Sequence, residues 1–86
     1  MYKTHKIYSV PKLNQIVKAC LKGDSKAQGE LYDLYSSRLY ALCLRYTNEG
    51  DQAKDILQEG FIKIFDKLHQ YKFKGSFEGW MRRIMV

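Results

Sequence analysis

The chain has 86 residues, enough for one small domain. Its apolar fraction of 45% and aromatic fraction of 14% indicate a packed core and exclude a disordered chain. Its net charge is +6. Apolar runs stay far below the ~20 residues that span a bilayer, and the N-terminus lacks a signal peptide's apolar stretch. We therefore expect a cytoplasmic protein with no membrane insertion.

Signatures of catalysis and metal binding are missing from the sequence. Cys20 and Cys43 lie 23 positions apart, with neither a CxxC motif nor a His pair nearby. We expect both to be reduced core thiols. No Ser/His/Asp set, carboxylate pair, P-loop or GxGxxG motif is visible, so we predict no enzyme activity, cofactor or metal.

The first predicted helix covers Pro11 to Lys22. Proline suits the first turn of a helix, and Gly23 ends this one. Its apolar residues follow the spacing of one buried face, and they are Leu13, Ile16, Val17, Cys20 and Leu21.

The second helix is expected to start at Ser25, with Gln28 completing a capping box, and to stop at Asn48 and Gly50. Its stripe consists of Leu31, Leu34, Tyr35, Leu42, Cys43 and Tyr46, and Tyr32, Leu39, Tyr40 and Leu44 widen it. Such a broad apolar surface predicts a central helix with several neighbours.

The third helix is expected to start at Asp51, a good N-cap, and to run to about Tyr71. Its core face holds Ala53, Ile56, Leu57, Gly60, Phe61, Ile64, Phe65 and Leu68. Gly60 weakens a helix interior by ~1 kcal/mol relative to Ala, which indicates close packing or close approach of a partner there.

A loop over residues 72–75 leads to a fourth helix capped by Ser76, with Glu78 in its first turn. Its apolar side holds Phe77, Trp80, Met81 and Ile84. The fold is therefore predicted to be all-α, a compact bundle of about four helices. The apolar pattern is still running at Val86, so we expect a fragment of a longer protein.

Charge is distributed unevenly along the chain. Residues 1–48 carry +5, residues 49–71 carry −2 and residues 72–86 carry +3. An acidic segment between two basic ones favours two surfaces with different partners over a uniform polyanion-binding coat.

The third helix carries a second stripe, made of Asp55, Gln58, Glu59, Ile62 and Asp66. These residues share one helix face, opposite the core stripe. The pattern suits a solvated acidic face. A solvated face is the usual meaning of such a pattern, but Ile62, an apolar residue among carboxylates and amides, also suits a small protein-binding patch.

Aromatic and basic residues alternate across the loop and the fourth helix. They are Tyr71, Lys72, Phe73, Lys74, Phe77, Trp80, Arg82 and Arg83, and the polar Ser76 lies among them. Positive side chains attract phosphates, and exposed aromatic rings stack on unpaired bases, so this combination favours single-stranded nucleic acid. The alternative is that some of these rings belong to the core. We expect Phe77 and the aliphatic Ile84 to be buried and Phe73 to be exposed, and the spacing leaves both outcomes open for Trp80.

Three segments together resemble region 2 of bacterial RNA polymerase sigma factors, especially the extracytoplasmic-function group. That group has the pattern D-A-x-D-x-x-Q-E-x-F followed by F-x-x-W-L-x-R-I. Residues 51–61 read DQAKDILQEGF, with Lys54 intervening, and residues 75–84 read GSFEGWMRRI. The opening GDSKAQGELYDLY also matches. The resemblance covers about residues 12–86 and leaves residues 1–10 as an N-terminal extension.

This resemblance implies a transcription initiation factor domain with two partners. Helix three would bind the β′ clamp coiled coil of RNA polymerase through Asp55, Gln58 and Glu59, with Ile62 beside them. The loop and helix four would recognise and melt the promoter minus-ten element as non-template single strand. The residues implied are Tyr71, Lys72, Phe73, Lys74, Ser76, Trp80, Arg82 and Arg83.

The resemblance further implies an anti-sigma factor as regulator. The C-terminal domain for the minus-thirty-five element is absent from this sequence. Primary sigma factors have two adjacent aromatics where this chain has Gly79 and Trp80, so one strand-separating wedge is missing. Two alternatives remain from the residues alone: a duplex-DNA-binding helical domain, and a helical protein-interaction module without a polymerase role.

Overall fold

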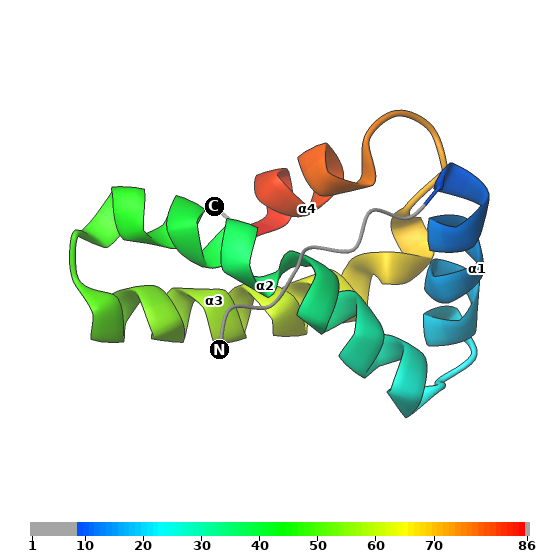
Figure 1. Cartoon of the computed structure of the whole chain (residues 1–86), viewed down its shortest axis with the longest axis horizontal. Coiled ribbons are helices and arrows are strands. Elements are labelled where there is room, and N and C mark those ends of the chain that lie inside the picture. Colours follow the sequence, from blue (N-terminus) through cyan, green and yellow to red (C-terminus); the bar gives the residue numbers. More distant parts are fainter. Residues whose placement is uncertain (1–8, 86) are drawn as a thin grey trace.

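A computed structural model describes residues 9–85, which form four α-helices and one 3-10 helix, with no strand among them. The elements are α1 (Val10–Leu21), α2 (Ser25–Thr47), α3 (Gly50–Lys67), the 3-10 helix η1 (Leu68–Gln70) and α4 (Phe77–Met85) (Figure 1). The predicted all-α bundle is confirmed. Most of the expected extension over residues 1–10 lies outside the described residues, and Val10 already belongs to α1.

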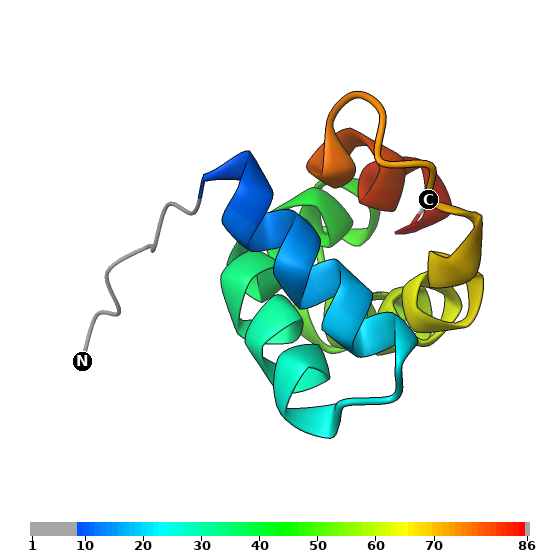
Figure 2. The ribbon, with the colours of Figure 1, turned by 90° about the vertical axis from the view of Figure 1, so that its right-hand side faces the viewer.

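Helix α2 packs against each of the other three α-helices, as its broad apolar surface predicted. A short turn joins α2 to α3, which returns alongside it, and α4 lies against this pair (Figure 1). Helix α1 crosses the first half of α2 and contacts η1 (Figure 2). The loop between η1 and α4 therefore lies near α1.

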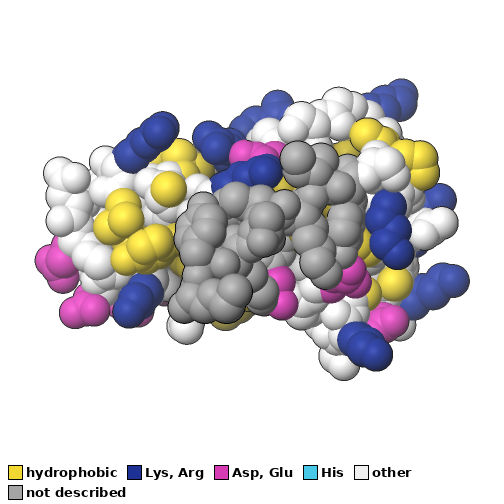
Figure 3. Space-filling model, viewed as in Figure 1, with side chains coloured by type: hydrophobic (Ala, Val, Ile, Leu, Met, Phe, Trp, Pro, Cys, Tyr) yellow, Lys and Arg dark blue, Asp and Glu magenta, His cyan; other side chains and the backbone are white. Residues whose placement is uncertain are grey.

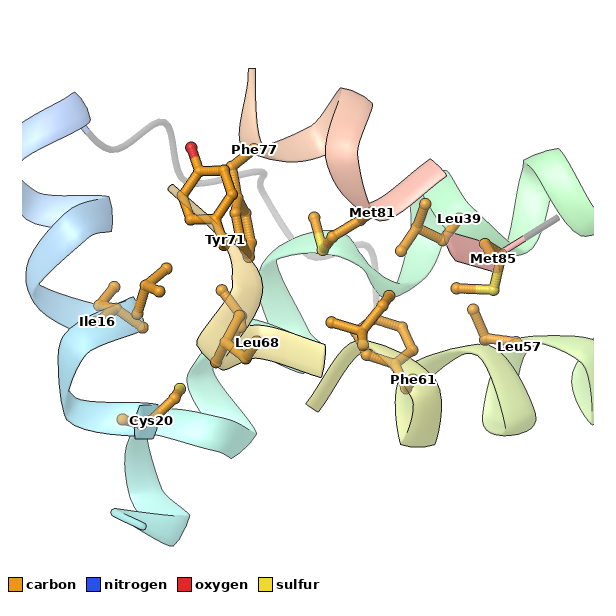
Figure 4. Close-up of a cluster of buried hydrophobic side chains, with 14 of the residues drawn as sticks. Ile16, Cys20, Leu39, Leu57, Phe61, Leu68, Tyr71, Phe77, Met81 and Met85 are labelled. Carbon is orange, nitrogen blue, oxygen red and sulfur yellow. The ribbon is translucent and has the colours of Figure 1, made fainter. Parts of the chain in front are cut away.

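The core is built from all four α-helices and η1. Its fully buried larger side chains are Val17, Leu31, Leu39, Cys43, Ile64, Leu68 and Met81. In Figure 4, Met85 of α4 lies beside Leu57 of α3 and near Leu39 of α2. Each helix thus contributes one apolar face to a common interior.

The buried face of α2 differs from the predicted stripe at its end. Tyr46 was expected to be buried but is 65% exposed. The buried positions Ala27, Leu31, Leu39 and Cys43 lie at multiples of four residues. Since four residues turn an α-helix about 40° past a full circle, the buried face rotates along α2. That rotation follows the change of neighbours and leaves Tyr46 outside.

Helix α2 starts at Ser25 as predicted, but the N-cap residues of α2 and α3 differ from the sequence prediction. The N-cap of α2 is Asp24, whose carboxylate accepts hydrogen bonds from the backbone N–H groups of Lys26 (2.9 Å) and Ala27 (3.2 Å). An ionised acceptor makes the stronger cap, so the Ser25 capping box is wrong. The N-cap of α3 is Glu49, without a side-chain hydrogen bond, and not Asp51.

The third helix ends earlier than predicted. It stops at Lys67, tightens into η1, and leaves Tyr71 in extended backbone. A 3-10 turn is a common ending for an α-helix. Here it turns the chain so that the Tyr71 ring enters the core at 8% exposure.

Gly60 of α3 lies directly against the Met85 side chain of α4. A Cβ built on Gly60 would overlap the Sδ of Met85 and lie 2.7 Å from its Cε. The predicted close packing at this glycine is confirmed, and the neighbour is another helix of the same chain.

Candidate protein- and nucleic-acid-binding surfaces

The second stripe of α3 faces solvent. Asp55, Gln58, Glu59 and Asp66 are exposed, and Ile62 is 69% exposed. The opposite side of α3 enters the core. An apolar side chain this exposed among carboxylates adds little to folding and is available to a protein partner.

A groove of about 390 Å³ runs beside this stripe, between α2 and α3. Its lining residues are Tyr32, Ser36, Ser37, Tyr40, Lys54, Leu57 and Gln58. The groove was not predicted from the sequence, because Tyr32 and Tyr40 were assigned only to the wide apolar surface of the second helix. The spacing of Tyr32, Ser36 and Tyr40 at every fourth residue was the available signal. Through Gln58, the groove is continuous with the exposed stripe.

An aromatic cluster occupies the junction of the loop and α4, with Tyr71 at its centre. Its ring centroid lies 5.0 Å from that of Phe73, 4.9 Å from Phe77 and 5.3 Å from Trp80. Burial raises the pKa of the Tyr71 hydroxyl. Figure 4 shows Tyr71 and Phe77 side by side in the core. Phe77 is buried, as expected.

The two remaining rings of the cluster, Phe73 and Trp80, are partly exposed. Phe73 was expected to be exposed, but its ring packs on Tyr71, and Lys18 of α1 lies over it with the ammonium 5.7 Å from the centroid. Its backbone adopts the left-handed conformation, with φ 59°. Trp80, which the sequence allowed to be either buried or exposed, stacks on Phe77 with the two ring centroids 5.7 Å apart. Both side chains keep part of their surface in solvent.

Basic side chains surround this cluster. Lys72, Lys74, Arg82 and Arg83 are all exposed. Figure 3 shows Lys and Arg side chains along the upper edge of this face, and others over the α1 side and beside the turn between α2 and α3. Asp and Glu side chains lie at that turn and also elsewhere on the face, so the basic residues of the loop and α4 belong to a surface of mixed charge.

Ser76 has a structural task as well as a place on this surface. Its hydroxyl accepts a hydrogen bond from the backbone N–H of Gly79 at 3.1 Å, so it caps α4 as predicted. The cap fixes the direction in which α4 leaves the loop.

The two cysteines are free and buried. Burial, reinforced by the Asp24 carboxylate, raises the pKa of the Cys20 thiol from 9.0 to about 11. Burial also raises the pKa of Cys43. Within residues 9–85, no group of three or more His, Cys, Asp and Glu side chains is arranged to hold a metal ion. No helix in this part of the chain is long and apolar enough to cross a membrane.

The chain is similar to a known protein family and to several curated proteins. The sigma-70 region 2 family model matches residues 31–86. The ECF RNA polymerase sigma factor SigW of Bacillus subtilis is 32% identical over 68 residues, covering 79% of this chain and 36% of that protein. The ECF RNA polymerase sigma-E factor of Escherichia coli K12 is 35% identical over 71 residues, covering 83% and 37%.

A third relative, the RNA polymerase sigma-H factor of Pseudomonas aeruginosa, is 29% identical over 72 residues, covering 84% of this chain and 37% of that protein. The chain thus spans little more than a third of the length of these curated relatives. No solved structure matches the chain.

Proposed function

The chain belongs to the sigma-70 region 2 family, within the extracytoplasmic-function group of sigma factors, and from this premise we propose that it is a non-enzymatic transcription initiation factor domain. In this proposal α3 binds the β′ clamp coiled coil of RNA polymerase. The loop and α4 bind the non-template strand of the promoter minus-ten element. An anti-sigma factor is the proposed regulator.

The observation that carries the polymerase part is the exposed stripe of α3. Asp55, Gln58, Glu59 and Ile62 face solvent on one side of the helix, while its other side builds the core. Asp55, Gln58 and Glu59 match the family motif, and Ile62 lies beside them. No packing role within the described residues explains an isoleucine that is 69% exposed. The adjoining groove between α2 and α3 adds two tyrosines at which a helical partner can bury apolar surface.

The DNA part rests on the combination of exposed basic side chains and partly exposed rings. Four basic residues surround Phe73 and Trp80, whose exposed surface is available to bases. Tyr71 is buried, so its ring supports Phe73 and Trp80. A strand that flips a base out of its stack loses a few kcal/mol, which stacking and pocket contacts offset.

The polymerase proposal is tested with the triple variant Asp55→Ala, Gln58→Ala and Glu59→Ala. Exposed charges contribute ~0–1 kcal/mol to folding, so this variant should melt close to the unchanged protein. It should no longer retain the isolated β′ clamp coiled coil in a pull-down. The control is Gln15→Ala with Asp33→Ala, which removes an exposed amide and a carboxylate from α1 and α2. Unchanged retention by the triple variant would reject the assignment.

The DNA proposal is tested by fluorescence anisotropy with single-stranded minus-ten oligonucleotide and matched duplex at low salt. Phe73→Ala should weaken single-strand binding by ~1–3 kcal/mol if a base stacks on this ring. Tyr46→Ala, which removes an exposed ring from α2, should leave binding unchanged. Equal affinity for both DNAs together with no effect of Phe73→Ala would contradict the proposal.

A further inference from the structure

The Glu78 carboxylate in α4 is shared by two arginines. Its Oε1 accepts a hydrogen bond from Nη1 of Arg38 in α2 at 2.7 Å. Its Oε2 accepts two from Arg82, from Nε at 3.3 Å and Nη2 at 3.0 Å. The Glu78 side chain is 24% exposed and each arginine side chain 43%. One anchored carboxylate therefore holds two guanidinium groups at the surface.

This cluster combines two positive charges with one negative charge and stays cationic. Exposed ion pairs contribute little to stability, so the fold does not depend on it. The cluster instead fixes geometry. Two N–H groups of Arg82 donate to the same oxygen of Glu78, and this holds the plane of the Arg82 guanidinium. Arg38 is brought to the same spot from 40 positions earlier in the sequence.

We propose that Glu78 is a positioning residue of the DNA-binding surface and that Arg38 of α2 belongs to that surface. The inference rests on the proposed function of the loop and α4. Glu78 orients Arg82 toward a phosphate and aligns Arg38 as a second phosphate contact beside it. The surface then extends from α4 onto α2, beyond the residues that the loop and α4 supply.

The Glu78→Gln variant separates positioning from simple electrostatics. As a bare negative charge near DNA, Glu78 would repel phosphates, and its removal would strengthen binding. As a positioning residue, its loss frees both arginines, and affinity for the single-stranded oligonucleotide should fall about threefold or more despite the gained net positive charge. Asp66→Asn, which removes an exposed carboxylate from α3, is the control and should not weaken binding.

The Glu78→Asp variant tests whether weaker binding arises only because helix α4 is destabilised. This variant keeps the negative charge in the first turn, where it favours the helix dipole, but withdraws the carboxylate by one methylene. We expect it to weaken DNA binding as well, with unchanged circular dichroism. Restoration of full binding by Asp would overturn the positioning role.

Arg38→Gln tests the added contact. It should lower affinity and flatten the plot of log K against log salt by about 0.7, the value for one phosphate on a single strand. Lys63→Gln removes the same charge from an exposed site on α3 and should leave the slope unchanged. If Arg38→Gln behaves like Lys63→Gln while Lys72→Ala still flattens the slope, this inference fails and the proposed function stands. If Lys72→Ala also has no effect, the DNA-binding function itself fails.

Discussion

Phe73 combines a strained backbone with a position at the edge of the proposed DNA surface. A residue with a Cβ loses roughly 1–2 kcal/mol in the left-handed conformation that Phe73 adopts at φ 59°. Contacts with Tyr71 and Lys18 hold the ring in place. The loop therefore depends on a side chain whose own backbone preference opposes it.

This strain can be measured by comparing two truncations of Phe73. Both Phe73→Ala and Phe73→Gly remove the ring, but only glycine relieves the backbone strain. We expect Phe73→Gly to unfold at higher urea concentration than Phe73→Ala, by about 1 kcal/mol of unfolding free energy. An alanine variant of equal or greater stability would show that the loop relaxes to another conformation.

Cys20 should make stability depend on pH in the alkaline range. Its pKa is raised from 9.0 to about 11 in the fold, so the folded state retains a proton that the unfolded chain releases. The contribution of the protonated Cys20 thiol to the free energy of unfolding is complete below pH 9 and is lost as the pH rises toward 11. Urea titrations of the unchanged protein and Cys20→Ala should show their difference in unfolding free energy changing across that window. A constant difference would contradict the raised pKa.

At the scale of elements, Gly60 of α3 leaves room for the Met85 side chain of α4 to lie directly on the backbone of α3. Gly60→Ala adds about 1 kcal/mol of helix propensity, but its methyl group must displace the Met85 side chain at a cost of about 1–3 kcal/mol. We expect net destabilisation in a thermal melt. Gly29→Ala in α2, where nothing lies within 4 Å, should instead stabilise the protein.

A double-mutant cycle assigns this effect to the helix contact. Met85→Ala leaves space that the methyl group of Gly60→Ala can occupy, so the double variant should lose less stability than the sum of the single variants. Strict additivity would mean that Met85 moves aside without cost and that the glycine is not needed for packing.

Helix periodicity predicted every α-helix because each buries a stripe at the 3.6-residue period. The ends were harder, because neighbouring polar residues compete as caps: Asp24 and Ser25 stand side by side, and the carboxylate prevails. Whether a residue at the margin of an apolar stripe is buried depends on which element packs against it, and that depends on the tertiary structure. For this reason the predicted burial of Tyr46 and the predicted exposure of Phe73 were wrong.

At the scale of the molecule, the exposed stripe of α3 and the surface of the loop and α4 share no described residue, although α2 adjoins both. We expect them to act independently. The triple variant of α3 should keep its affinity for single-stranded DNA within about twofold, as separate sites usually add. Lys72→Ala should keep clamp retention. A strong effect of either change on the other partner would reveal coupling through the core.

The sequence predicted both surfaces in outline, since charge segments and helix faces are local properties. It could not predict the Glu78 cluster, because Arg38 and Glu78 are 40 positions apart and meet only when α4 lies beside α2. Nor could it show that Tyr71 is buried as the support of two other rings.

The protonated, buried state of both cysteines has a practical consequence for spectroscopy. Maleimide dyes react with thiolates at accessible sites, and near neutral pH neither native thiol offers one. A cysteine introduced at exposed Ser37, on the rim of the groove, would therefore take up a fluorophore selectively without removal of Cys20 or Cys43. Such a labelled protein would report the arrival of a partner at α3 through its emission, with the core sequence left intact.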